Sequence, residues 1–295
     1  MKRIVVVVNP IAGKKRKISP EQMVQDVLSD NVLVDWLYWA TAEMDIGNAV
    51  IEKLNSGVYD LVVVFGGDGT VNRIARALLH RNEPLLIIPL GSGNGLARHL
   101  KIPMNPYKAL ALALNGTAKS IDAAQMNNEI YFCTAGVGFD AYIAYKFAHA
   151  GSRGLKTYVK TVFREFFSYK SKYYTITSSN QQIKTKAFFI TVANANQWGN
   201  NVKVAPHAKI NDGLLELIVL KSFKWLELPM LLLMMVLNCF HRSYRIQHYS
   251  LPYFEINSNE KQLFAHFDGE PMLLYPPIVF KSLPGAIRVV VGNAK

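Results

Sequence analysis

Cysteine is scarce in this sequence, since the chain of 295 residues contains only Cys133 and Cys239. So few cysteines cannot build the disulfide framework of a small secreted domain, and disulfide-poor chains are typical of reducing compartments. No spacing of histidines and cysteines resembles a zinc site. These absences exclude a disulfide-stapled scaffold and a zinc module, and we expect a cytoplasmic protein.

Long apolar runs are missing as well. A membrane-spanning helix needs about 20 consecutive apolar residues, and no stretch reaches that length. The apolar run at 4–8 ends in Asn9-Pro10 and is too short for the apolar core of a signal peptide. A GxxxxGK[S/T] motif is also absent, which excludes a P-loop mononucleotide fold, and no internal repeat indicates a solenoid.

Acidic residues are fewer than basic ones: 21 against 33, a net charge of +12. This excess indicates an acidic partner, whether phosphates, nucleic acid or anionic lipid. Half of the residues are hydrophobic, so the chain is globular, and its length allows two domains with separate cores.

The segment Leu61–Asn72 organises the first half. Residues 61–65 form a continuous apolar, β-branched run, the pattern of a strand buried on both faces. Gly66, Gly67 and Gly69 then permit positive φ and let backbone N–H groups approach a ligand. Thr70 is predicted to cap a helix that follows.

A glycine turn between a strand and a helix is typical of a phosphate site, because the helix dipole and unpaired N–H groups point into it. Asp68 within the turn indicates a metal ion or its waters. The alternative is a tight strand–helix connection without a ligand.

Other strands, helices and loops of the first half alternate in the same way. We expect strands at 4–8, 32–38 and 85–88, helices at 20–29 and 41–54, and a second glycine loop at 89–95. The pattern predicts a doubly wound parallel sheet with a ligand crevice at the carboxyl ends of its strands. The basic run at 14–17 is either a solvated face or a phosphate contact.

The pattern changes near residue 122, after which shorter, more alternating strands indicate antiparallel pairing. We expect them at 130–134, 173–178, 186–192, 214–220, 252–256, 262–267, 277–280 and 286–291. The sequence therefore predicts a nucleotide-type α/β domain at 1–124 and a β-rich domain at 125–295.

Two helical inserts interrupt the second half. In Ser152–Tyr169, the basic residues Lys156, Lys160 and Arg164 share one face, which predicts salt-sensitive attraction to an anionic membrane. The insert Trp225–Phe240 is apolar all round and rich in methionine. Such a helix is buried in the protein or a dimer, or it contacts lipid, and both alternatives stay open.

Acidic turns supply the candidate chemistry of the second half. Gly136–Ala141 matches a loose dinucleotide pattern, but we reject it because no second βαβ unit follows. Asp212-Gly213 leads into a strand. Asp268-Gly-Glu270 puts two carboxylates at the end of a sheet, where one could act as general base for a hydroxyl and the other could hold Mg²⁺. A plain hairpin is the alternative for both turns.

The ordered set of motifs resembles the diacylglycerol kinase catalytic-domain family, which includes bacterial lipid kinases and sphingosine kinases. The motifs are Asn9-Pro-x-Ala-Gly13, Gly66-Gly-Asp-Gly-Thr70, Pro89-Leu-Gly-Ser-Gly-Asn94, the Asp-Gly turn at 212–213 and Asp268-Gly-Glu270. The resemblance implies a phosphofructokinase- or NAD kinase-like α/β domain, an antiparallel β-sandwich domain with helical inserts, and a cleft between them.

The resemblance also implies site residues. Nucleotide contacts are expected from Asn9, Gly13, Thr41, Gly66, Gly67, Asp68, Gly69, Thr70, Asn72 and Ser92. Asp268 and Glu270 are the expected catalytic carboxylates. A structural Mg²⁺ is expected at Asp212 and the carbonyls of Leu215 and Leu217.

We therefore predict a lipid kinase that uses ATP and Mg²⁺ to phosphorylate a lipid hydroxyl, diacylglycerol-like or sphingoid-base-like, at the inner face of an anionic membrane. No nucleic acid partner is expected, and a homodimer is left open. One alternative is an NAD kinase-like enzyme. The other is a catalytically silent lipid-binding module, motivated by Arg73 and Gly95, where the family more often has Glu and Asp.

Overall fold

The computed structural model describes residues 2–10, 18–28, 32–39, 41, 44–149, 155–179 and 181–293, with the backbone alone at 155–160. Gly13 and the basic run at 14–17 lie outside these residues, as do the side chains of Lys156 and Lys160. The chain forms two compact units. The first consists of Met1–Asp122, Gly199–Asn201 and Pro284–Lys295, and the second of Ala123–Trp198 and Val202–Leu283.

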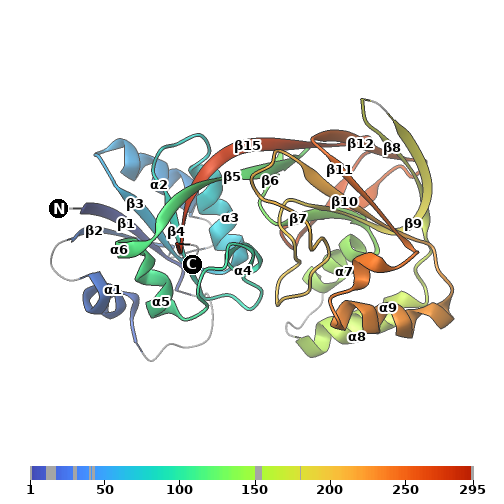
Figure 1. Cartoon of the computed structure of the whole chain (residues 1–295), viewed down its shortest axis with the longest axis horizontal. Coiled ribbons are helices and arrows are strands. Elements are labelled where there is room, and N and C mark those ends of the chain that lie inside the picture. Colours follow the sequence, from blue (N-terminus) through green and yellow to red (C-terminus); the bar gives the residue numbers. More distant parts are fainter. Residues whose placement is uncertain are drawn as a thin grey trace. The chain divides into compact units, whose positions relative to one another are not determined.

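The first unit is built on a parallel sheet with strand order β4-β3-β1-β2 (Figure 1). Its strands are β1 (Lys2–Val8), β2 (Val32–Tyr38), β3 (Leu61–Gly66) and β4 (Leu85–Pro89). Every residue of β3 and β4 is buried, as the continuous apolar runs predicted. The end of β15 (Ile278–Val291) joins this sheet beside β4, where Val289 pairs with Leu85. The division predicted at residue 124 lies close to Asp122, where the first stretch of the first unit ends. It does not include residues 284–295, which also belong to the first unit.

The helices of the first unit are α1 (Pro20–Leu28), α2 (Ile46–Asn55), α3 (Asp68–Ala77), α4 (Gly95–His99), α5 (Pro106–Leu110) and α6 (Leu112–Asn115). Figure 1 shows α2 and α3 on one side of the parallel strands and α1 and α5 on the other. Two predictions of helix starts were wrong. The helix expected from residue 41 begins at Ile46, because the Asp45 carboxylate accepts the Asn48 N–H at 3.1 Å and caps it. The cap of α3 is Gly67, and Thr70 lies inside its first turn.

The second unit is antiparallel. Its strands are β6 (Glu129–Tyr131), β7 (Thr134–Gly138), β8 (Lys172–Thr177), β9 (Gln182–Ala193), β10 (Leu215–Lys221), β11 (Ile246–Leu251), β12 (Tyr253–Ser258), β13 (Leu263–Phe267) and β14 (Glu270–Leu274), and β5 (Thr117–Met126) and β15 enter it from the first unit. The sequence analysis missed β5, β11 and β14, and its strand at 130–134 reaches only the first residue of β7. Strand β14 contains Pro271. Proline has no N–H group for pairing, but it is tolerated here because β14 is an edge strand that pairs with β13 alone among the described strands.

The helical segments of the second unit are α7 (Phe139–Ala148), α8 (Leu155–Phe166), η2 (Trp225–Glu227), α9 (Leu228–Val236) and η3 (Phe240–Arg242). Leu231 of α9 joins an aromatic cluster with Phe139, Phe188, Phe189 and Phe240. Arg164, the described member of the predicted basic stripe, forms an ion pair with Glu165 at 2.8 Å. No helix in the described part of the chain is long and apolar enough to cross a membrane.

Candidate active site

Three strands of the first unit end at the same edge of the parallel sheet. Val8 of β1 pairs with Phe65 of β3, and Gly66 of β3 pairs with Pro89 of β4. The Asn9 N–H donates to the Phe65 carbonyl at 3.2 Å, and the Leu90 N–H donates to the Gly66 carbonyl at 2.9 Å. The loops that follow these strands, which carry the motifs singled out in the sequence, therefore lie together.

Asp68 fastens the second glycine loop to the first. One carboxylate oxygen accepts the Asn94 N–H at 2.7 Å, and the other accepts the Gly95 N–H at 2.7 Å. The Asn94 side chain in turn accepts the Gly91 N–H at 2.9 Å and donates to the Gly91 carbonyl at 2.7 Å. The sequence indicated a metal at Asp68, whereas in the structure both carboxylate oxygens accept hydrogen bonds from backbone N–H groups.

The glycines of these loops make room for the two loops to touch. A Cβ atom on Gly91 would lie 2.7 Å from the Gly67 Cα atom, and one on Gly66 would lie 2.5 Å from the Thr70 Cβ atom. Gly66, Gly67 and Gly69 all have negative φ, so the positive φ anticipated for this turn was wrong. Space for the neighbouring loop explains Gly67 and Gly91, and space for the Thr70 side chain explains Gly66.

We predict that Gly91→Ala separates the two loops, because the added methyl group meets backbone that cannot rotate away. Overpacking of this kind costs about 1–3 kcal/mol, and we expect ATP affinity to fall at least about tenfold. Gly292→Ala is the matched control, since its Cβ atom would lie 3.8 Å from Leu112, an ordinary contact. Thermal unfolding and ATP titration measure both effects, and an unchanged Gly91→Ala protein would contradict the proposed fit of the loops.

Three of the other expected nucleotide residues, Asn9, Thr70 and Asn72, lie at the start of α3. The Asn9 side-chain amide donates to the Thr70 hydroxyl at 2.9 Å, and Asn72 is buried. Thr41 and Ser92 are exposed. Arg73 is exposed too, and its guanidinium lies 5.2 Å from the centre of the Trp39 ring. The first-turn N–H groups of α3, a helix of 10 residues, have no partners within the helix and can donate hydrogen bonds to a phosphate.

In the second unit, Asp268 and Gly269 are the central residues of a tight hairpin between β13 and β14. Their φ angles are +45° and +85°, the signs of a type I′ turn, and Phe267 pairs with Glu270. The plain-hairpin alternative therefore describes this backbone correctly.

The Asp268 carboxylate accepts three backbone hydrogen bonds. The donors are the N–H groups of Phe132 at 2.9 Å, Cys133 at 2.8 Å and Thr134 at 3.1 Å. The Asp268 N–H donates to the Thr134 carbonyl at 2.8 Å. These bonds join the hairpin to the chain that connects β6 to β7. Oδ1 accepts two of these bonds and Oδ2 accepts one, so three of the roughly four acceptor positions of the Asp268 carboxylate hold the hairpin in place.

Glu270 is different, although it lies two residues away. Its side chain is exposed at the start of the edge strand β14, and it makes no hydrogen bond or ion pair with a described residue. Of the two predicted catalytic carboxylates, Glu270 is therefore the more exposed and the less constrained by hydrogen bonds.

A buried polar cluster behind this hairpin escaped the sequence analysis. One oxygen of Asp140 in α7 accepts the Thr191 hydroxyl at 3.0 Å and lies 3.1 Å from Nε2 of His266 in β13. His266 is nearly fully buried. The three residues are far apart in the sequence, so no local motif predicts the cluster. A histidine within the apolar run of β13 does indicate a buried polar contact. The cluster fixes β13, and thereby its hairpin, against α7 and β9.

The residues expected to hold a structural Mg²⁺ do not fit one ion. Leu215 and Leu217 are buried in β10, where alternate carbonyl oxygens lie about 6.8 Å apart. Two oxygen ligands of one Mg²⁺ are at most about 4.2 Å apart. The Asp212 carboxylate is exposed and accepts the Leu214 N–H at 3.1 Å. The described residues contain no group of three or more His, Cys, Asp or Glu side chains that could hold a metal.

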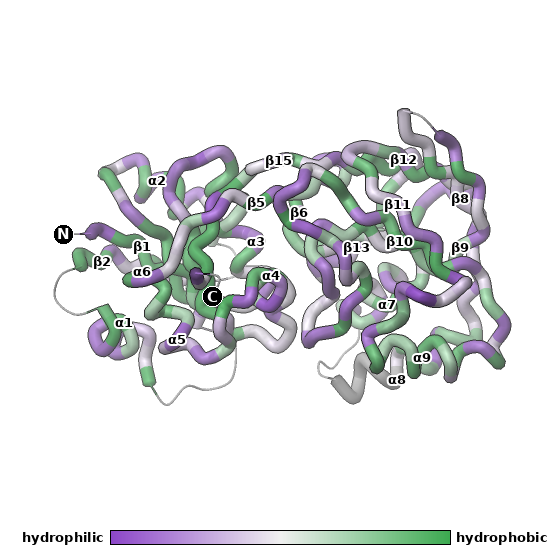
Figure 2. Tube along the Cα trace, in the orientation of Figure 1, coloured by the Kyte–Doolittle hydropathy of each residue, from purple (hydrophilic) through white to green (hydrophobic). Residues whose placement is uncertain are grey.

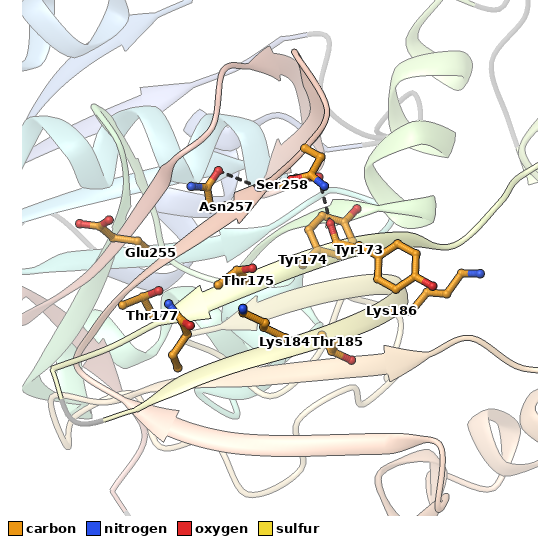
Figure 3. Close-up of a pocket in the computed structure, with 12 residues that line it drawn as sticks. Tyr173, Tyr174, Thr175, Thr177, Lys184, Thr185, Lys186, Glu255, Asn257 and Ser258 are labelled. Atoms are coloured by element: carbon orange, nitrogen blue, oxygen red, sulfur yellow. Dashed lines mark hydrogen bonds between the residues drawn. The ribbon is translucent and has the colours of Figure 1, made fainter.

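A polar hollow of about 810 Å³ lies on the face of β8, β9 and β12 (Figure 3). Thr175 pairs with Lys184 on one side and with Asn257 on the other, and residues of all three strands line the hollow. None of the predicted site residues lines it. It is an open sheet face, distinct from the two glycine loops and from the 268–270 hairpin.

The comparisons with known proteins agree with this arrangement. A family model described as the diacylglycerol kinase catalytic domain matches residues 3–126, and one described as the YegS C-terminal NAD kinase beta sandwich-like domain matches residues 133–291. A crystal structure described as a diacylglycerol kinase from Bacillus anthracis has the same fold, with a TM-score of 0.73 at 21% identity over 99% of this chain and 97% of that chain.

Curated relatives are similar over most of their length. A Pectobacterium atrosepticum protein named "Probable lipid kinase YegS-like" is 33% identical over 223 residues, 72% of this chain and 72% of the relative. A Shewanella frigidimarina protein of the same name is 28% identical over 268 residues, 85% of this chain and 82% of the relative.

The chain therefore belongs to the diacylglycerol kinase catalytic-domain family. Within that family it is a YegS-like member, with the YegS C-terminal domain as its second half. The family predicted from the ordered motifs is confirmed, and so is the combination of a parallel α/β part with a C-terminal β-sandwich-like part.

Proposed function

We propose that the protein is an ATP-dependent lipid kinase that transfers the γ-phosphoryl group to the hydroxyl of a diacylglycerol-like or sphingoid-base-like lipid. Membership of the family implies ATP as the donor. One observation supports the proposal above the others: the Asp68 carboxylate binds the amides of Asn94 and Gly95 and so joins two glycine loops at the end of a parallel sheet.

The proposal assigns nucleotide binding to the first unit. The amides at the start of α3 and the loop around Ser92 bind the phosphates, while Asn9 orients Thr70 at the edge of this site. Mg²⁺ held by the phosphates of ATP would supply neutralisation of their charge. The protein residues contribute position and hydrogen bonds, which phosphoryl transfer needs more than covalent chemistry.

The proposal assigns the acceptor to the second unit. Glu270 accepts the proton of the lipid hydroxyl as the lipid oxygen bonds to the γ-phosphorus. The bond from that phosphorus to the bridging oxygen breaks, and the products are ADP and the lipid phosphate. Asp268 and the Asp140–His266 pair hold the hairpin that presents Glu270.

Transfer of labelled phosphate from ATP to a panel of lipids, followed by thin-layer chromatography, tests this function. The panel contains diacylglycerols, monoacylglycerol, ceramide, sphingosine and, for the rival enzyme class, NAD. Label in a lipid supports the proposal, and label in NADP supports an NAD kinase-like enzyme. Lipid binding without transfer to any acceptor would indicate a silent module and contradict the proposal.

A further inference from the structure

Helix α9 has an unusual distribution of apolar side chains. Its sequence, Leu-Pro-Met-Leu-Leu-Leu-Met-Met-Val, contains no polar side chain, yet only Leu231 is buried. A helix that is apolar on all sides normally lies in a core or against lipid. Burial within this chain, one of the alternatives that the sequence left open, is therefore not what the structure shows.

The exposed residues form a continuous stripe. Met230 and Leu233 are three residues apart and share a face of α9, while Leu226 in η2 and Leu237 directly after α9 extend the exposed apolar surface at its two ends. We call the exposed set the interfacial patch, which consists of Trp225, Leu226, Met230, Leu232, Leu233, Val236 and Leu237. In Figure 2, α9 shows as an apolar segment of the second unit. Between 41% and 78% of each of these residues is exposed, far more than isolated surface leucines require.

An aromatic hollow adjoins the patch at Trp225. It has a volume of about 350 Å³, and its lining includes Phe166, Phe167, Phe223, Trp225, Lys170 and Lys186. Phe167 and Trp225 are mostly exposed, at 72% and 68%. Rings and ammonium groups thus surround one concave surface, as at the interface between lipid headgroups and acyl chains.

Positive charge at this surface is not cancelled by the nearby carboxylates. Lys170 and Lys224 are exposed and form no ion pair with a described residue. Glu227 is bound by Arg245 at 2.8 Å and by the Tyr244 hydroxyl, and the Arg245 guanidinium holds the pKa of Glu227 at about 2. Glu165 is bound by Arg164 and by the Tyr142 hydroxyl.

We propose that the interfacial patch and the aromatic hollow dock the second unit on an anionic phospholipid bilayer. The patch enters the acyl region, and Lys170, Lys186 and Lys224 lie at the headgroup phosphates. The inference rests on the proposed function in that a lipid kinase must reach an acceptor held in a bilayer. A second copy fits less well, because a two-fold contact would bring the same lysines of both copies together.

Vesicle sedimentation of the full chain tests this docking. The probes are vesicles of phosphatidylcholine with one quarter phosphatidylglycerol, and vesicles of phosphatidylcholine alone, at low and high salt. We expect Leu233→Ser with Val236→Ser to weaken binding to the anionic vesicles at least about tenfold, since about 25 cal/mol is lost for each Å² of apolar area no longer buried. Val58→Ser with Leu114→Ser is the matched control, because these residues are 87% and 59% exposed in the first unit.

Two further measurements separate the contribution of the lysine charges from the insertion of the interfacial patch into the acyl region. Lys170→Gln with Lys224→Gln should weaken binding to anionic vesicles and reduce its salt dependence, but leave binding to pure phosphatidylcholine unchanged. Brominated acyl chains should quench tryptophan fluorescence in the parent protein. They should quench it much less in Trp225→Phe, because Trp36, Trp39 and Trp198 are less exposed than Trp225 and none of them belongs to the interfacial patch.

Binding that ignores both double variants would overturn the docking surface. So would a dimer that Leu233→Ser with Val236→Ser abolishes while vesicle binding stays constant, since the occupant would then be a second copy. Transfer to a short-chain soluble acceptor, assayed in parallel, separates this inference from the proposed function. Docking without any transfer refutes the kinase alone, and transfer by a protein that never binds vesicles refutes the docking alone.

Discussion

Glu270→Gln is expected to lower the turnover number by about 10²–10⁴-fold, the usual effect of losing a general base. The substitution keeps the size of the side chain and its capacity for hydrogen bonds but removes the proton acceptor. Because the side chain of Glu270 is exposed and makes no hydrogen bond or ion pair with a described residue, the unfolding temperature should stay unchanged. ATP affinity should also persist, since the glycine loops belong to the first unit.

The split between kcat and KM distinguishes a base from a residue that only binds substrate. Loss of a base should lower kcat and kcat/KM by the same factor, whereas loss of a substrate contact should raise KM. Glu52→Gln, an exposed carboxylate in α2, serves as the matched control. A Glu270→Gln enzyme with near-parental turnover would remove Glu270 from the mechanism.

Asp268→Asn should act mainly on stability. The carboxylate accepts N–H groups of Phe132, Cys133 and Thr134, and an amide in its place turns an NH₂ group toward at least one of these donors. Losing a buried hydrogen bond to a charged group costs roughly 1.5–3 kcal/mol. For a unit of this size, the unfolding temperature should fall by roughly 3–12 °C. Below that temperature, turnover should fall much less than in Glu270→Gln.

Asp212→Asn is the control for this prediction. Asp212 also precedes a glycine in a turn, but it is exposed and accepts one N–H group at 3.1 Å, so the free energy of unfolding should change by about 0.5 kcal/mol or less. Calorimetry and single-turnover assays measure the two effects. If Asp268→Asn instead kept parental stability and lost turnover a thousandfold, the base would be Asp268, as the sequence alone allowed.

Much of the first unit could be predicted because its information is local. A run such as Leu61–Phe65 is apolar throughout only when both faces of a strand are buried, and glycines directly after it indicate a turn that tolerates no side chain. The family, too, followed from the order of short motifs, and the comparisons confirm it. Helix boundaries were predicted less well. The start of α2, for example, depends on one hydrogen bond between the Asp45 carboxylate and the Asn48 N–H.

In the second unit, the sequence identified Asp268 and Glu270 as a pair but could not tell their roles apart. Both are carboxylates beside one glycine, and nothing local shows that amides at 132–134, more than 130 residues earlier, occupy only the first of them. The same holds for Asp140, whose partner His266 lies 126 residues away. Strand β14 was missed since Pro271 is tolerated only at a sheet edge, and edge position is a property of the assembled sheet.

Sequence alone determined the alternation of strands and helices, the glycine loops, the excess of positive charge and the apolar character of Leu228–Val236, because each is a property of neighbouring residues. Only the tertiary structure decided that Asp68 binds the second loop, that Asp268 is occupied while Glu270 is exposed, and that α9 leaves its apolar stripe uncovered. Each of these depends on which distant backbone groups approach a side chain, and pairing between distant segments is set by packing of the whole chain.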